Sequence, residues 1–235
     1  MSWSESSEDV QTQESALLEI ERRRERGEVY TKLDTKTGTK LASNFWAQSW
    51  QRHLATFEHY AGRLSRGRTC LRKGLVYNYE LKAGEVRAEV AGAALFEVVV
   101  RVRQMEPSQW AALVSCCAGR IGSTLDLLAG RLSDEVLATL TAPDGGLFPE
   151  ARDVQIVCSC TDHADVCEHG AAVLYAIGLG FDHDPASFFR LRGVEIGDLI
   201  HGAGSTLGSG GSGANVIPDS GLQSVFGIEI EFPPD

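Results

Sequence analysis

The feature that most constrains this chain is a group of cysteine and histidine residues in its second half. Cys158, Cys160, Cys167 and His169 follow the spacing C-x-C-x6-C-x-H. Three thiolates and one imidazole complete a tetrahedral zinc shell and leave no position open for water or substrate. A closed shell is typical of structural sites, so the pattern predicts one structural zinc ion that takes no part in catalysis.

The flanking residues favour the same site. Alternate residues of a strand share a face, so Val154 and Ile156 point the same way as Cys158 and Cys160. In the segment that follows, apolar residues recur at helical spacing from His169 to Ile177, with a stop expected at Gly178-Leu179-Gly180. Both apolar faces converge on the ligands, and we expect folding and metal binding to be coupled.

Two other interpretations account for this pattern less well. A redox Cys-x-Cys pair would leave Cys167 and His169 unexplained at their spacing. His163 is an alternative fourth ligand in place of His169, but its position in an acidic loop favours a solvated side chain. The remaining cysteines, Cys70, Cys116 and Cys117, are scattered, and Cys117 lies on an apolar helical stripe that predicts a buried thiol.

Composition places the chain among water-soluble globular proteins. Hydrophobic residues make up 43% and charged residues 23%. No apolar run reaches the roughly 18 residues of a membrane span, and the polar, acidic N-terminus is unlike a secretory signal. We therefore expect a cytoplasmic protein with no membrane partner, and in that reducing compartment clustered cysteines are metal ligands more often than disulfides.

The order of patterns predicts an α+β fold. Residues 1–43 are polar and partly disordered at their start, with one charged helix. Within an α+β domain at 44–150, apolar residues from Trp46 to Leu64 predict one helix, and period-two alternation over 69–103 predicts a three-stranded antiparallel meander. A helical segment follows from Pro107, with a short helix at Asp134–Leu140.

The last two regions complete the predicted organisation. Residues 151–195 form the small strand-loop-helix zinc finger. Residues 196–235 comprise a Gly/Ser-rich linker and a C-terminal apolar segment around Phe226, which docks on its own domain or on a partner.

Charge is unevenly distributed. The net charge of −10 argues against loose binding of nucleic acid. A local basic stripe nevertheless lies before the predicted meander, and two arginines lie after the finger. The candidate phosphate contacts are Arg63, Arg66, Arg68, Arg72, Lys73, Arg190 and Arg192. They indicate either a DNA-binding surface or a solvated face whose arginines pair with acids of the chain.

The ligand pattern resembles the SWIM-type zinc finger, Cys-x-Cys followed by a variable gap and Cys-x-His. Flanking features over residues 44–195, including Trp46, Trp50, an Arg66-Gly67-Arg68 strand start, Leu147-Phe148-Pro149 and Phe188–Gly193, are similar to a bacterial family of SWIM-finger proteins. The resemblance implies a module that binds DNA or protein, associated with helicase-like ATPases and without enzymatic activity of its own.

Catalytic motifs are absent from the sequence. There is no phosphate-binding loop ending in Lys-Ser/Thr, no G-x-S-x-G and no H-E-x-x-H. Asp162, His163 and Asp165 are expected to form an exposed acidic loop, and the Asp182-His183-Asp184 trio a helix-start turn before Pro185. We therefore expect no enzyme but a zinc-binding accessory subunit, with a DNA-binding adapter as the alternative.

Overall fold

The computed structural model describes residues 7–35, 41–142, 145–162 and 164–205. A four-stranded antiparallel sheet in the order β1-β2-β3-β4 lies at its centre. Strands β1 (Val76–Lys82), β2 (Glu85–Ala91) and β3 (Leu95–Val102) form the predicted meander, and β4 (Val154–Cys158) pairs with β3. The strand that precedes the first cysteine therefore extends the meander by one strand.

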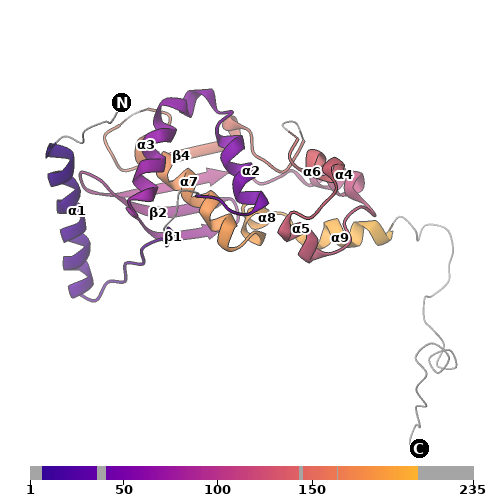
Figure 1. Ribbon diagram of the computed structural model, residues 1–235, viewed down its shortest axis with the longest axis horizontal. Coiled ribbons are helices and arrows are strands. Elements are labelled where there is room, and N and C mark those ends of the chain that lie inside the picture. The colour runs from indigo at the N-terminus through magenta and orange to yellow at the C-terminus, as the bar shows by residue number, and fades with distance from the viewer. Residues whose placement is uncertain (1–6, 36–40, 143–144, 163, 206–235) are drawn as a thin grey trace, which may run out of the picture. The chain divides into compact units, whose positions relative to one another are not determined.

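Alternation along the strands places one face of the sheet in the core. Val86, Ala88 and Val90 on β2 are buried, as are Val98 and Val100 on β3. This face is covered by α7 (Glu168–His183), and the helices α2 (Phe45–Leu54) and α3 (Ala61–Arg72) pack on α7 (Figure 1). The α+β fold class is confirmed.

The N-terminal helix α1 (Ser7–Glu25) packs against the rest of the fold. It begins within the first fifteen residues, where we expected disorder. Its Ala16 and Ile20 are each only 2% exposed and form a small cluster with Tyr77 and Ala91 of the sheet. These apolar contacts are long-range, which is why a polar local composition did not reveal them.

The single helix expected from Trp46 to Leu64 is wrong. Asn44 caps α2 by accepting the N–H of Ala47, and α2 then ends at Leu54. A 3-10 turn, η1 (Glu58–Tyr60), leads into α3. The apolar residues keep their period because both helices lie on the same core.

Arg66-Gly67-Arg68 lies inside α3 and does not begin a strand, so that expectation is also wrong. A Cβ on Gly67 would lie 2.6 Å from the backbone nitrogen of Ala172. The glycine therefore lets α3 pack directly on the backbone of α7, and packing outweighs the low helix propensity of glycine. The first strand starts later, after Gly74 with its φ of +68°.

The stop predicted at Gly178–Gly180 is wrong for the same reason. Helix α7 continues to His183. A Cβ on Gly178 would lie 2.9 Å from the indole of Trp50, and one on Gly180 would lie 2.7 Å from the hydroxyl of Tyr79. Both glycines make room for aromatic rings, and the surrounding core holds the helix together.

The remaining helices surround the other end of the core. The helical segment from Pro107 consists of α4 (Pro107–Cys117) and α5 (Thr124–Ala129), and the predicted short helix is α6 (Asp134–Leu140). After the 3-10 turn η2 (Ala151–Asp153) and α7 come α8 (Ala186–Arg192) and α9 (Ile196–Ser205). Buried aromatic side chains pack where α2, α7 and α8 meet: Trp46, Trp50, Phe181, Phe188 and Phe189.

Two findings bear on the sequence expectations about membranes and tails. Among the described residues, every helix is too short or too polar to cross a bilayer. The apolar segment around Phe226 and most of the glycine-rich linker lie outside the described residues.

Candidate metal centre

The four predicted ligands meet at one end of the sheet. Cys158 is the last residue of β4 and lies opposite Val98 of β3. Cys160 follows in the turn, Cys167 caps the N-terminus of α7, and His169 lies in the first turn of that helix. Their ligand atoms all lie within 4.8 Å of one another, so the cluster can hold one metal ion.

Each sulfur of the cluster accepts a backbone N–H. Cys160 N–H donates to Cys158 Sγ, and Asp162 N–H donates to Cys160 Sγ. Gly170 N–H donates to Cys167 Sγ at 3.3 Å, at the positive end of α7. Because hydrogen bonds from N–H groups favour the charged form of a thiol, the backbone is arranged for thiolates.

The three thiols compete for negative charge. The hydrogen bond from Cys158 lowers the pKa of Cys167 to about 3, with burial opposing it and His169 adding a further hydrogen bond. The same contact raises the pKa of Cys158, and burial raises that of Cys160. The protein alone thus favours one shared thiolate, and a cation is required to hold three at this separation.

His169 is oriented by groups outside the cysteine motif. Its Nδ1 lies 3.9 Å from Cys158 Sγ, while its Nε2 lies 3.8 Å from a carboxylate oxygen of Glu168. The ring packs on Phe96 with centroids 4.4 Å apart. A Cβ on Gly92 would lie 2.6 Å from Nε2, so only glycine leaves room for this ring at the β2–β3 turn.

The donor set fits zinc. In a tetrahedral site with Zn–S bonds of about 2.3 Å, the sulfurs lie about 3.8 Å apart, which is within the 4.8 Å that encloses the ligand atoms of this cluster. Three sulfurs and one imidazole nitrogen are typical zinc ligands, and they fill all four positions. Glu168 beside Nε2 is the kind of partner that fixes the ring of a metal-binding histidine.

The loop between the second and third cysteines is tied to α3. Asp162 forms an ion pair with Arg63 at 3.0 Å. Asp165 is exposed, as expected for this acidic loop, and His163 lies outside the described residues. Arg63 therefore has a structural partner in the loop of the metal centre.

The predicted basic contacts differ in their surroundings. Arg66, Arg68 and Arg72 are exposed on α3, and so is Lys73, the residue that caps its C-terminus. Arg68 donates to the hydroxyl of Tyr175 at 3.1 Å and lies over its ring. Arg190 on α8 is exposed and lies 3.4 Å from Asp184.

Arg192 differs from the expected surface cation. It is only 5% exposed, and its guanidinium donates to the backbone carbonyl of Arg103. Burial lowers its pKa, and Asp153 partly offsets that effect. Its charge therefore acts inside the fold and has no access to phosphate.

The other residues singled out in the sequence have structural roles. Cys117 is fully buried, as predicted, and burial raises the pKa of Cys70 to about 12, which makes it an inert thiol. Asp182 accepts hydrogen bonds from Ser43 and from the backbone of Asn44. These hydrogen bonds anchor the start of α2 on the end of α7.

Sequence reasoning missed Gly92 and Phe96, which shape the pocket of His169. Gly92 is recognisable in the sequence only as a break between two strands. Its approach to His169 depends on the tertiary packing of the β2–β3 turn against α7, and no local pattern signals that.

The comparison with known proteins found a relative of moderate sequence identity. Over 161 residues the chain is 34% identical to Rv2102, an uncharacterized protein of Mycobacterium tuberculosis. The match covers 66% of this chain and 58% of that protein, so the chain spans little more than half of its relative. No family model and no solved structure matches the chain.

Proposed function

We propose that this chain is a non-catalytic recognition module with one structural zinc ion in a SWIM-type finger. The observation that carries the proposal is the convergence of Cys158, Cys160, Cys167 and His169 within 4.8 Å. These residues would hold the zinc, which supplies a cross-link and no reactive position because its shell is full. The cross-link ties the end of β4 to the start of α7.

The placement of the site supports a structural role. Helix α7 packs on α2, α3 and the sheet, and its residues Ala171–Leu179 are buried. The site fixes the N-terminal end of α7, the helix around which the core is built. Its removal is therefore expected to weaken the fold and not to abolish a reaction.

We propose that the chain acts as an accessory subunit that binds a protein partner, and that this partner is a helicase-like ATPase. The likeness of the ligand motif to SWIM fingers supports this, and so does the acidic net charge of −10, which is unfavourable for general nucleic-acid binding. A catalytic role has no comparable support, because the metal shell is closed and the other acidic clusters have structural partners.

A DNA-binding adapter is the second candidate, and the exposure of Arg66, Arg68 and Arg72 on α3 and of Lys73 at its C-terminus favours it. Arg63 of the same helix contacts the loop of the metal centre. Phosphate contacts would lower the logarithm of affinity by about 0.9 per neutralised phosphate for each tenfold rise in salt. Binding to random duplex DNA at low and moderate salt separates the two candidates; no binding even at low salt removes this one.

The central experiment is native mass spectrometry of the protein purified from its source. We expect one zinc per chain, together with a retained large ATPase. Cys160→Ala should lose the zinc, whereas Cys116→Ala, which changes an exposed cysteine outside the cluster, should keep it. A metal-free wild-type chain that remains folded would contradict the proposal.

A further inference from the structure

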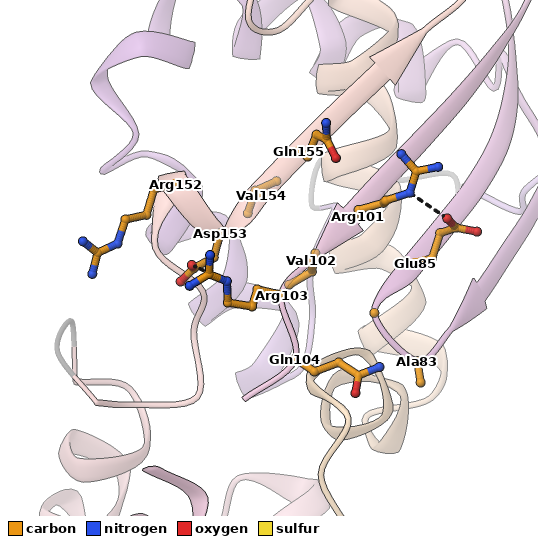
Figure 2. A pocket seen from close by; sticks show the side chains of 11 residues that line it. Ala83, Glu85, Arg101, Val102, Arg103, Gln104, Arg152, Asp153, Val154 and Gln155 are labelled. Atoms are coloured by element: carbon orange, nitrogen blue, oxygen red, sulfur yellow. Dashed lines mark hydrogen bonds and ion pairs between the residues drawn. The ribbon is translucent and has the colours of Figure 1, made fainter. Parts of the chain in front are cut away.

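A second candidate site lies at the other end of β4 from Cys158. A hollow of about 750 Å³ is formed where β2, β3 and β4 end side by side. We call it the arginine groove; it contains Arg101, Arg103, Arg152, Glu85, Asp153 and Gln155. Figure 2 shows the three guanidinium groups spread around it, with Arg101 directed toward Glu85 and Arg103 beside Asp153.

The sheet register brings these residues together. Glu85 lies opposite Arg101 across the β2–β3 pair, and Arg101 lies opposite Gln155 across the β3–β4 pair. The backbone N–H of Arg103 donates to the carbonyl of Asp153, which continues the ladder beyond β4. Arg101 and Arg103 are two residues apart, so extended backbone places their Cα atoms about 6.7 Å apart. Figure 2 shows the two side chains directed to different carboxylates, Arg101 to Glu85 and Arg103 to Asp153.

Arginines outnumber carboxylates among the residues that line the groove, although the chain as a whole carries −10. Arg101 pairs with Glu85 and Arg103 with Asp153, both of which line the groove, whereas Arg152 pairs at 2.8 Å with Glu150 outside it. The side chains of Arg101, Arg103 and Arg152 are 50%, 68% and 77% exposed. A guanidinium has five N–H donors, and one carboxylate neighbour leaves several of them for a ligand.

Carboxylates of the fold hold the arginines in place. Glu85 accepts from Arg101 at 3.0 Å and also from Arg87, and these contacts keep its pKa low, so it stays charged. Asp153 lies 3.4 Å from Arg103, and its side chain is only 14% exposed. The buried Arg192 donates to the carbonyl of Arg103 and thereby anchors the backbone from which the Arg103 side chain extends. A ligand would therefore meet guanidinium groups that are already oriented.

The chemistry of the groove favours a carboxylate-bearing peptide over nucleic acid. Alternate residues of an extended peptide lie about 6.7 Å apart, which is also the backbone separation expected between Arg101 and Arg103. Arginine binds carboxylates in a bidentate manner. None of the residues that line the groove is aromatic, so it offers no platform on which the bases of a single strand could stack.

We propose that the arginine groove binds an acidic segment of a partner protein in extended conformation, with alternate carboxylates on Arg101 and Arg103. The inference rests on the proposed function in that it names the partner chemistry of the recognition module. It places that contact away from the zinc, so the two can be tested separately.

The test is fluorescence anisotropy with the full-length, zinc-loaded protein. The probe is a fluorescein-labelled peptide that alternates glutamate with threonine, and the matched peptide carries glutamine in place of glutamate. The test variant combines Arg101→Gln and Arg103→Gln. The control is Arg87→Gln, because Arg87 pairs with the same Glu85, is 48% exposed and lies outside the groove.

We expect the glutamate peptide to bind and the glutamine peptide to fail. The double variant should lose about tenfold in affinity, and Arg87→Gln should change it by less than about twofold. Equal binding by the wild type and the double variant, or no binding of the glutamate peptide, would overturn the inference. Arginine-dependent binding of a single-stranded oligonucleotide without peptide binding would overturn it in favour of a phosphate site.

Two further readouts keep the result interpretable. Zinc content and the thermal midpoint of the double variant should match the wild type. If it fails to fold, Arg152→Gln replaces it, with an expected loss of about threefold, and unchanged binding counts against the groove. If the protein retains zinc and an ATPase partner but the groove variants bind the glutamate peptide normally, only the groove proposal is refuted. If a zinc-free chain binds the glutamate peptide, only the proposed zinc-dependent function is refuted.

Discussion

Replacing Gly92 with alanine tests whether His169 is a metal ligand or only fills space. The new Cβ would lie 2.6 Å from Nε2 of His169 and 3.1 Å from the ring of Phe96, whereas ordinary contacts begin at 3.4 Å. The imidazole must therefore retreat by about 0.8 Å, while ligand distances in a metal site tolerate about 0.2 Å. Disturbing the groups that orient a ligand costs about 10–100-fold in metal affinity, or about 1.4–2.7 kcal/mol.

The assay is zinc competition between the protein and a chromophoric chelator. Gly62→Ala is the control, because nothing lies within 4 Å of a Cβ at Gly62 and its backbone suits alanine. His169→Ala should lose at least as much affinity as Gly92→Ala, since it removes the ligand itself. If Gly92→Ala folds normally and binds zinc as tightly as the wild type, His169 does not coordinate the metal and the four-ligand reasoning is refuted.

Three other predictions concern stability. The new Cβ of Gly67→Ala would lie 2.6 Å from Ala172 N and force α3 away from α7. We expect the free energy of unfolding to fall by about 2 kcal/mol and the thermal midpoint by about 4–8 °C. Gly62→Ala on the same helix is the control and should leave the midpoint unchanged or slightly higher. Adding EDTA should lower the thermal midpoint of the wild type in scanning fluorimetry and leave that of Cys160→Ala unchanged, because the metal stabilises only a chain that binds it when folded. Burial lowers the pKa of His53 below its ordinary 6.5, so on acidification the unfolded chain binds this proton before the folded chain does. The free energy of unfolding measured in urea should therefore fall as the pH drops through about 6.5. The fall should be less steep in His53→Gln.

Much of the fold follows from periodicity in the sequence. The alternation of Val86, Ala88 and Val90 predicts a strand with one buried face, and all three side chains are buried. Several of the errors involve glycine. Gly67, Gly178 and Gly180 resemble breaks because isolated helices disfavour glycine, yet here each one lies against another element that leaves no room for a side chain.

The metal centre was determined by the sequence to an unusual degree, because its ligands come from one strand and the helix that follows it. Local geometry alone brings Cys158, Cys160, Cys167 and His169 into reach of one ion. Only the tertiary structure decided that Gly92 and Phe96 shape the histidine pocket, and that Arg101 meets residues of β2 and β4 in one groove. Such contacts depend on strand register and helix packing, and spacing along the chain carries no information about either.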